Sequence, residues 1–251
     1  MILISPSKNL NIRSETINFN FSEPKFKKKI KALSDSLKGL SISELKSLMP
    51  ISDKLVELNI KRFENFGKPD NPKKPAVFLF TGATFDGLSI RSFDKDSYDY
   101  VQRNLRILSG LYGILKPFDI IQPYRLEMGT NTVKLINSSL YEFWSNDISQ
   151  NLNEELKING SKYLFNLSSK EYFSVLDYKK INAEVINFDF KVKLNDEYKN
   201  IGMQIKKMRG SMAKFIIDNK IDTIGPLKNF ELNNFKFEKL LPKTNTLLFT
   251  A

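Results

Sequence analysis

The sequence contains no cysteine and no histidine among its 251 residues. Without cysteine there are no disulfides, no catalytic thiolate and no thiolate ligands for a metal cluster. Without histidine, the commonest general base and transition-metal ligand is missing, and a histidine-dependent catalytic triad is excluded. Any metal site would need oxygen ligands, which suit magnesium or calcium. We expect no metal site and no cofactor, so any chemistry must use Lys, Arg, Tyr, Ser, Asp or Glu.

Long apolar runs are also missing. No stretch approaches the roughly 20 consecutive apolar residues of a transmembrane helix, so we expect no membrane association. The opening residues MILISPSK have neither the basic nor the long apolar region of a secretory signal. Hydrophobic residues at 41% and charged residues at 27% are typical of soluble globular proteins. We predict a cytoplasmic protein in which residues 1–251 form a single domain, and we favour a monomer.

The net charge of +11 is compatible with a polyanionic partner such as nucleic acid. The alternative explanation is compositional. The chain is rich in Lys, Asn, Ile and Phe, as an AT-rich coding sequence would produce, and such lysines carry no information about partners. Cations clustered at one place would favour a polyanionic partner, and scattered cations would favour the compositional explanation.

Hydrophobic patterning predicts strands interspersed with helices, without a regular βαβ rhythm. We therefore predict a mixed α/β (α+β) fold, with a mixed sheet flanked by helices. The predicted strands are residues 1–5, 76–80, 132–136, 162–167, 183–192, 235–240 and 246–250. The predicted helices are residues 22–38, 52–65, 98–109 and 140–157, a short one that begins with a capping box at Ser41, and a segment at 203–217 that starts as a strand and turns helical.

The stretch SGLYGILKPFDIIQPYRLEMG, residues 109–129, combines glycines and prolines with apolar residues throughout. Within it, Arg125 and Glu127 are two residues apart, so they point the same way in an extended chain, and Tyr124 points the opposite way unless Pro123 introduces a bend. The pair is either a buried ion pair that braces the chain or part of a site. In a site, Arg125 would bind a phosphate or carboxylate, and Glu127 would orient a hydroxyl, amine or base edge. The candidate catalytic residues are Glu127 and Tyr124.

Other polar residues are candidates for the same site. Lys8 follows the first strand, where α/β proteins tend to place ligand-binding groups. Lys207 and Arg209 are candidate phosphate ligands, although a solvated basic helix flank is the alternative. Gly210 inside a helix costs about 1 kcal/mol relative to alanine, which the close approach of a backbone or a ligand could justify. The predicted cleft-lining residues are Asn166, Ser169, Glu171 and Tyr172, with helix capping as the alternative for a serine.

Four blocks of sequence resemble the YaaA peroxide-stress protein family. The longest is the stretch at residues 109–129. The others are ILISPSK at Ile2–Lys8, NLSSKEYF at Asn166–Phe173 and KKMRGSMAKFII at Lys206–Ile217. Ser7, Ser168 and Met208 stand where the family has alanine. Because the blocks occur in the family's order, the chain is identified as a member.

The resemblance implies a role in the oxidative-stress response, with a limit on intracellular free iron. It also implies a mixed α/β fold with a positively charged cleft and a helix-hairpin-helix element that binds DNA. Iron control would be indirect, because the chain lacks histidine and cysteine.

On this interpretation, a helix at Tyr98–Ser109 ends at the hairpin GLYG, whose glycines allow a phosphate to approach backbone N–H groups. Pro117 would either shorten the second helix or begin a new first turn, and a simple helix C-cap at the first glycine is the alternative to the whole motif. Double-stranded DNA would bind without sequence preference and with strong salt dependence. The predicted hairpin contacts are Gly110, Tyr112, Gly113 and Lys116.

Two classes of function remain open. The first is a non-enzymatic, DNA-binding stress protein, which a broad basic groove leading to the hairpin would favour. The second is an enzyme acting on a nucleotide, nucleoside or nucleic acid, which a polar pocket too narrow for duplex DNA would favour.

Overall fold

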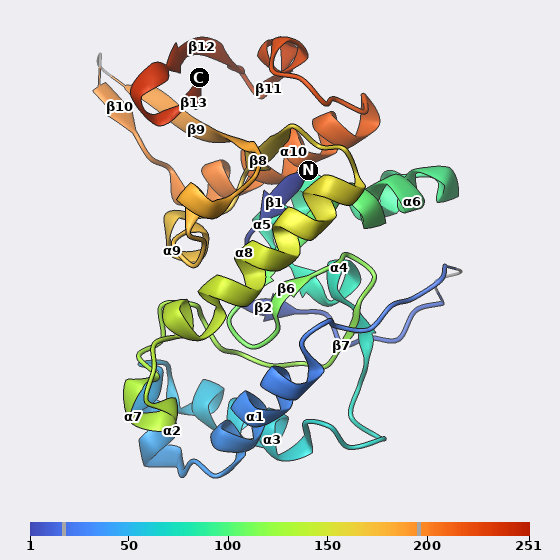
Figure 1. Ribbon diagram of the computed structural model, residues 1–251. Helices are drawn as coiled ribbons and strands as arrows, with labels where there is room; N and C mark the ends of the chain where they lie inside the picture. The colour runs from blue at the N-terminus through green and yellow to red at the C-terminus, as the bar shows by residue number, and fades with distance from the viewer. Residues whose placement is uncertain (17–18, 195–196) are drawn as a thin grey trace.

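The computed structural model describes residues 1–16, 19–194 and 197–251, in which short strands alternate irregularly with helices (Figure 1). The helices are α1 Lys27–Lys38, α2 Ile42–Leu48, α3 Asp53–Asn65, α4 Ala76–Leu79, α5 Ala83–Leu88, α6 Lys95–Asn104, α7 Val133–Ile136, α8 Leu140–Ile158, α9 Lys170–Phe173 and α10 Gly202–Asp218. The strands are β1 Ile2–Ile4, β2 Asn9–Leu10, β3 Lys74–Pro75, β4 Phe80–Thr81, β5 Leu105–Ser109, β6 Gly113–Leu115, β7 Ile120–Ile121, β8 Tyr163–Asn166, β9 Glu184–Leu194, β10 Glu197–Lys199, β11 Glu231–Leu232, β12 Phe235–Leu241 and β13 Thr246–Thr250.

Most strands join one mixed sheet of nine strands, which has the order β11-β12-β13-β9-β8-β1-β5-β6, with β10 paired to β9. β1 runs parallel to both of its neighbours, β5 and β8. β8, β9 and β13 are also parallel, whereas β6, β10, β11 and β12 pair antiparallel. The predicted mixed α/β fold is therefore confirmed. Since β1 and β8 end at the same edge of the sheet, the segments that follow them lie close together.

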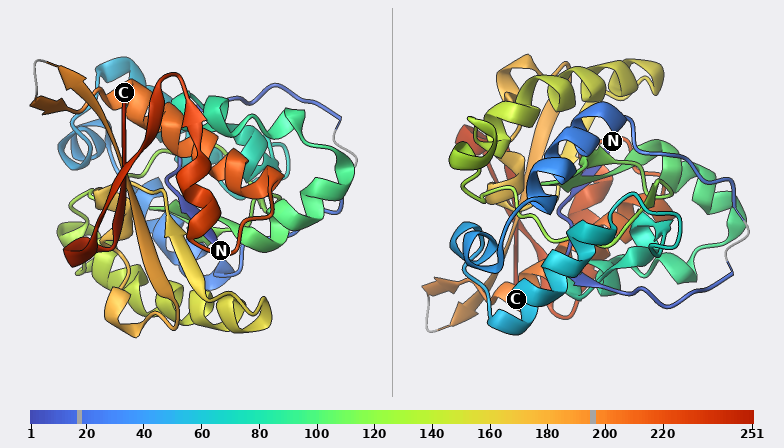
Figure 2. Two further views of the ribbon diagram at one scale, coloured as in Figure 1. Left: turned by 90° about the horizontal axis from the view of Figure 1, so that it is seen from above. Right: turned by 90° about the horizontal axis from the view of Figure 1, so that it is seen from below.

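Helices cover both faces of the sheet, with α8 on one side and α10 on the other (Figure 2). In α8, the buried residues Leu140, Trp144, Ile148, Leu152 and Leu156 recur every four residues, which places them on one face of the helix. This face packs onto the core and buries the single tryptophan completely. Among the described residues, no helix is both long enough and apolar enough to cross a membrane.

Helices α5 and α10 contact each other through glycines. A Cβ atom on Gly210 would overlap the carbonyl oxygen of Thr84 and would lie 2.8 Å from the backbone nitrogen of Leu88. On the other helix, a Cβ on Gly87 would overlap the carbonyl oxygen of Lys207. The close approach of a backbone therefore explains the glycine within α10.

Several predicted elements are wrong in type. The predicted helix 98–109 is helical only as far as Asn104, and Leu105–Ser109 is the buried strand β5. Residues 76–79 form the helical turn α4 where a strand was predicted, and the predicted strand 132–136 contains the helical turn α7. The segment at 203–217, which was predicted to start as a strand, is helical throughout as part of α10. Short apolar runs have no distinctive period, so a buried strand and a buried helical turn look alike in sequence.

Candidate functional site

The GLYG segment is a tight turn between two strands. β5 pairs antiparallel with β6, with Ser109 opposite Gly113, so the segment is a β-hairpin and the predicted helix-hairpin-helix at this position is wrong. The backbone of Leu126 fills the space in which Gly110 would carry a side chain. Gly113 has a positive φ of 74°, and a Cβ there would lie 2.8 Å from the ring of Trp144. These glycines therefore allow tight packing in the core.

Consequently, three of the four residues predicted to contact DNA at the hairpin are buried, and the fourth, Lys116, is only half exposed. Tyr112 is buried, and its hydroxyl oxygen accepts a hydrogen bond from the backbone N–H of Gln122 at 2.9 Å. Gly110 and Gly113 are buried as well. Lys116 is half exposed, but its ammonium group lies 3.6 Å from Glu155, which also pairs with a buried arginine.

Tyr124 and Arg125 point in opposite directions, as an extended chain predicts. The hydroxyl of Tyr124 lies 2.6 Å from the hydroxyl of Ser109 in the core. Burial raises the pKa of Tyr124, and the hydrogen bond to Ser109 offsets only part of this effect. The phenol therefore stays protonated and hydrogen-bonded beneath the surface, and it is poorly placed to reach a substrate.

Arg125, Glu127 and Lys8 form a chain of ion pairs. A guanidinium nitrogen of Arg125 donates to Glu127 Oε1 at 2.9 Å, and Lys8 Nζ lies 2.7 Å from Glu127 Oε2. Burial opposes ionisation of Glu127, but the hydrogen bonds and charges of Lys8 and Arg125 together outweigh it and hold the pKa of Glu127 below its usual value. The carboxyl group is therefore ionised at neutral pH and can accept, but not donate, a proton.

This ion-pair chain is open to solvent on one side. The side chains of Lys8, Glu127 and Arg125 are 56%, 26% and 13% exposed, respectively. They line a recess of about 620 Å³, which is called the Arg125 recess below. A sealed structural brace would leave no such opening, so the ion pairs are available to a ligand. The other lining residues are Ser47, Leu48, Met49, Pro50, Ile51, Gly129, Thr130, Asn131 and Glu171.

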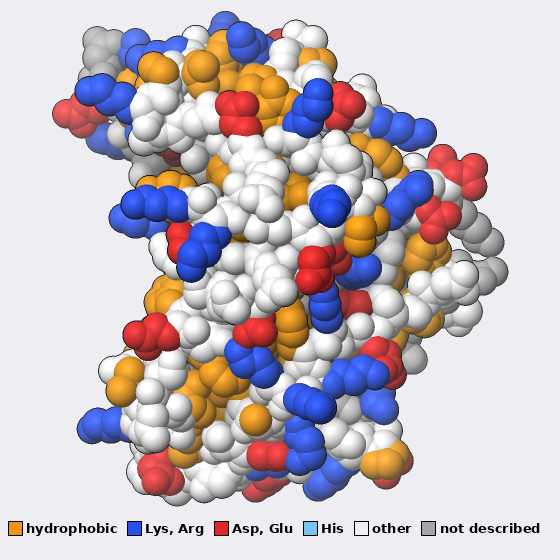
Figure 3. All heavy atoms as spheres, in the orientation of Figure 1, with side chains coloured by type: hydrophobic (Ala, Val, Ile, Leu, Met, Phe, Trp, Pro, Cys, Tyr) orange, Lys and Arg blue, Asp and Glu red, His pale blue; other side chains and the backbone are white. Residues whose placement is uncertain are grey.

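The walls of the Arg125 recess come from distant parts of the chain. Ser47–Ile51 link α2 to α3 and supply an apolar wall with Leu48, Met49 and Pro50. Glu171, in α9, accepts a hydrogen bond from the backbone N–H of Gly129 at 3.0 Å. Figure 3 shows the surface hollowed at its left edge, between the levels at which Figure 1 places α9 and α2.

The remaining predicted cleft residues support this edge of the sheet. The backbone N–H of Ser169 donates to the hydroxyl of Ser5 at 2.8 Å, which ties the segments after β8 and β1 together. The side-chain amide of Asn166 donates to Asn187 on β9 at 2.8 Å, and its carbonyl oxygen accepts from Ser168. Tyr172 is buried, and burial raises the pKa of its phenol. These residues hold the backbone in place, whereas Glu171 faces the recess.

Lys207 and Arg209 are not among the residues that line the Arg125 recess. Lys207 is exposed on α10. Arg209 is largely buried, and burial lowers its pKa, although Asp189 offsets part of the shift. The Nε atom of Arg209 is buried without a hydrogen-bond partner among the described residues. Of the predicted site residues, the Arg125 recess therefore brings together only Lys8, Arg125, Glu127 and Glu171.

Sequence reasoning missed Arg62 on α3. Burial lowers the pKa of Arg62, and the positive charge of Arg125 lowers it further, so the two guanidinium groups act on each other. Arg62 donates to Asn59 at 3.1 Å but forms no ion pair with any carboxylate that the structure describes. The Nε atom of Arg125 is likewise buried without a partner among the described residues. Two cations close enough to repel each other favour the binding of an anion.

Charged side chains of both signs are mixed over the face in Figure 3, and no broad groove of one sign is seen among the described residues on that face. The Arg125 recess itself contains two cations and two carboxylates, so it is polar without being strongly basic. No group of three or more Asp or Glu residues in the described part of the chain is placed to hold a metal ion.

Comparison with known proteins gives consistent matches over nearly the whole chain. A family model described as "Peroxide stress protein YaaA" matches residues 1–241. A UPF0246 protein of Idiomarina loihiensis is 40% identical over 251 residues, which cover 99% of this chain and 97% of that protein. A UPF0246 protein of Flavobacterium johnsoniae is 42% identical, with 99% of both chains covered. A third, from Francisella philomiragia, is 38% identical and covers 100% of this chain and 99% of its own.

Proposed function

Because the chain belongs to the peroxide stress protein YaaA family, we propose that it serves the peroxide-stress response by binding a nucleotide or nucleoside in the Arg125 recess. One observation carries this proposal. Lys8, Arg125, Glu127 and Glu171 come from three distant segments and line one open recess. Its volume of about 620 Å³ lies within the range of small-molecule sites and is too small for duplex DNA.

The lining groups match the parts of a nucleotide. Arg125 offers positive charge to a phosphate, and the nearby charge of Arg62 adds to the positive potential. The carboxylates of Glu127 and Glu171 can accept hydrogen bonds from ribose hydroxyls or from the amino group of a base. The apolar wall at Leu48–Ile51 provides a surface against which a base or sugar can pack.

Glu127 would have a defined role if the bound molecule reacts. Its lowered pKa keeps it ionised at neutral pH, so it can act as a general base or a hydrogen-bond acceptor and not as an acid. An incoming phosphate would compete with Glu127 for Arg125 and Lys8, which would free the carboxylate to approach the ligand. If the protein is instead an enzyme that acts on a nucleotide, Glu127 is therefore the residue expected to act as its general base.

Isothermal titration of nucleotides and nucleosides against the purified protein tests the proposal. Arg125→Gln should weaken the binding of a nucleotide by about ten-fold or more, which corresponds to the loss of roughly 1.5–3 kcal/mol from a hydrogen bond to a charged group. Arg13→Gln is the matched control, because Arg13 is exposed and lies outside the recess. Binding that is equally strong in both variants, or no binding of any nucleotide to the wild type, would overturn the proposal.

A thermal melt of Arg125→Gln separates a binding role from a structural one. If Arg125 mainly binds ligand, the variant should melt within a few degrees of the wild type in the absence of ligand. A fall corresponding to about 3–5 kcal/mol would instead identify the ion pair as a structural brace.

A second candidate function, non-specific binding of double-stranded DNA, rests on the net charge of +11. Since the GLYG turn is buried, DNA would have to contact exposed lysines elsewhere on the surface. The logarithm of the binding constant should then fall linearly with the logarithm of salt concentration, by about 0.9 for each phosphate contact. Absence of binding at low salt would end this proposal.

We also propose that the protein limits intracellular free iron. This effect would be indirect, because the sequence has no histidine or cysteine to bind iron. DNA and nucleotides as ligands also favour a cytoplasmic location.

A further inference from the structure

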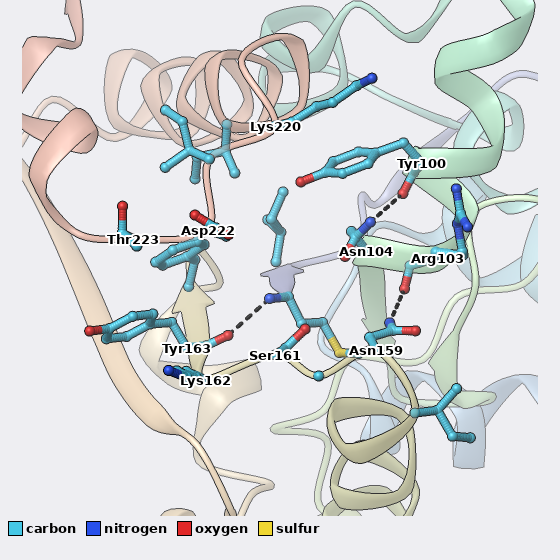
Figure 4. A pocket seen from close by; sticks show the side chains of 17 residues that line it. Tyr100, Arg103, Asn104, Asn159, Ser161, Lys162, Tyr163, Lys220, Asp222 and Thr223 are labelled. Atoms are coloured by element: carbon cyan, nitrogen blue, oxygen red, sulfur yellow. Dashed lines mark hydrogen bonds between the residues drawn. The ribbon is translucent and has the colours of Figure 1, made fainter.

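A second recess, of about 800 Å³, lies where strands β1 and β8 begin, and thus at the other edge of the sheet from the Arg125 recess. Figure 4 shows that it is enclosed by the C-terminal ends of helices and by the loops that follow them. Tyr100 and Arg103 come from α6, Ser161 and Lys162 follow α8, and Lys220–Thr223 follow α10. It is called the Tyr100 recess below.

Cationic side chains outnumber carboxylates in the Tyr100 recess. Its charged lining side chains are Arg103, Lys162 and Lys220 against a single carboxylate, that of Asp222. None of the three cations forms an ion pair with a carboxylate of the described residues, and all three are exposed. In the Arg125 recess, by contrast, Glu127 forms ion pairs with both lining cations. The cations of the Tyr100 recess are therefore available to an anionic ligand without the loss of an existing ion pair.

Neutral hydrogen-bond donors lie between these cations. The hydroxyl groups of Tyr100, Ser161 and Thr223 line the recess and make no hydrogen bond to any residue that the structure describes. Figure 4 shows the Tyr100 hydroxyl and the Asp222 carboxylate directed toward the middle, with Arg103 and Lys220 at the margin. Burial and Asp222 raise the pKa of Tyr100, so its phenol is an O–H donor at neutral pH.

Lys220 also has an unusual backbone conformation. Its φ of 48° lies in the left-handed region, where the other non-glycine residues that the structure describes are asparagine or serine. A lysine has no side-chain hydrogen bond to the local backbone that would favour this conformation. Lys220 completes a Schellman motif at the end of α10, in which the backbone N–H of Ile221 donates to the carbonyl oxygen of Ile216 at 2.9 Å. The conformation places this cation directly after α10, at the margin of the recess.

We propose that the Tyr100 recess binds a chain of two or three phosphates, with Arg103, Lys162 and Lys220 as the cationic ligands. The phosphate chain can belong to a nucleoside triphosphate or to an inorganic oligophosphate. Asp222 opposes this binding by repulsion, since its carboxylate faces the same space. The site is independent of the ligand proposed for the Arg125 recess.

Titration calorimetry with three probes tests the site and distinguishes the two sources. Inorganic tripolyphosphate and ATP should both bind in magnesium-free buffer, and adenosine should not. Tighter binding of ATP than of tripolyphosphate would assign the nucleotide, because the aromatic and apolar lining would then contribute. Binding of adenosine equal to that of ATP, or failure of both phosphate compounds to bind, would overturn the proposal. All titrations use the Arg125→Gln background, which weakens binding in the other recess, and the variants of the Tyr100 recess described next assign the remaining signal.

Two variants give opposite expected shifts. Arg103→Gln combined with Lys220→Gln should weaken tripolyphosphate binding about ten-fold, since each exposed charge pair contributes up to about five-fold. Asp222→Asn should tighten it about two- to five-fold, because it removes a repulsive charge at similar shape. Lys236→Gln, on the exposed strand β12, is the matched control and should change nothing. An unchanged double variant, or weaker binding by Asp222→Asn, would contradict the proposal.

Discussion

Replacement of Gly210 by alanine tests the contact between α5 and α10. Within a helix, alanine is favoured over glycine by about 1 kcal/mol, so an isolated helix would become more stable. In the folded protein, the new Cβ would overlap the carbonyl oxygen of Thr84 and would lie 2.8 Å from the backbone nitrogen of Leu88. These neighbours are backbone atoms, which cannot rotate away, so the two helices would have to separate.

The two effects have opposite signs, and the overlap should dominate. Overpacking of a core costs typically 1–3 kcal/mol, and a backbone overlap belongs at the upper end of that range. After subtraction of the gain of about 1 kcal/mol in helix propensity, the expected net loss is about 2 kcal/mol. For a chain of this size, that loss should lower the melting temperature by about 4–8 °C.

Circular dichroism during thermal and urea denaturation measures this loss. Gly202→Ala is the matched control, because Gly202 begins the same helix and a Cβ there would meet nothing within 4 Å. This control should be neutral or stabilising by up to about 1 kcal/mol. A Gly210→Ala variant that melts at or above the wild-type temperature would refute the reasoning, since propensity would then outweigh the contact.

Three further predictions concern charge and oxidation. Glu155→Ala should lower the free energy of unfolding in urea by about 3–5 kcal/mol, because Arg106, whose side chain is 3% exposed, would lose its partner at 2.6 Å; a loss below about 1 kcal/mol would show that the pair is dispensable. Met203, at 78% exposure, should be oxidised by peroxide before the other five methionines, which are at most 6% exposed, and mass spectrometry of peptides from the treated native protein would detect any other order. The lowered pKa of Glu127 stabilises the folded state above the ordinary glutamate pKa of about 4.3, and this contribution is lost as the pH falls through the folded-state pKa. The difference in melting temperature between the wild type and Glu127→Gln should therefore shrink on acidification, and a constant difference from pH 6 to pH 2.5 would contradict the assignment.

The sequence allowed part of the Arg125 recess to be predicted, for two physical reasons. Residues that follow parallel strands meet at one edge of the sheet, which brings Lys8 after β1 near Glu171 after β8. The alternation of an extended chain sets Arg125 and Glu127 on one side and Tyr124 on the other. The second rule is local and holds without knowledge of the topology, whereas the first also requires that β1 and β8 lie side by side and parallel.

The rest of the recess depends on long-range packing. The wall at Ser47–Ile51 comes from the end of α2 and the segment that leads to α3, and no local motif indicates where these helices dock. Arg62 looks in sequence like an ordinary cation on an amphipathic helix, and only its position next to Arg125 gives it meaning.

The prediction of a helix-hairpin-helix at GLYG fails for a related reason. Leu105–Ser109 is buried throughout, so its apolar residues fit a helical period by chance, and the two glycines fit both a phosphate-binding hairpin and a crowded core.

The packing of Trp144 provides a built-in optical reporter. This single tryptophan lies against Gly113, and its indole N–H donates to the carbonyl oxygen of Gly110 at 2.9 Å. Its intrinsic fluorescence therefore arises from one place, the junction of α8 with the β5–β6 turn. A red shift of its emission would signal that water has reached this junction, so loosening of the segment that ends in Arg125 and Glu127 can be followed without any added label.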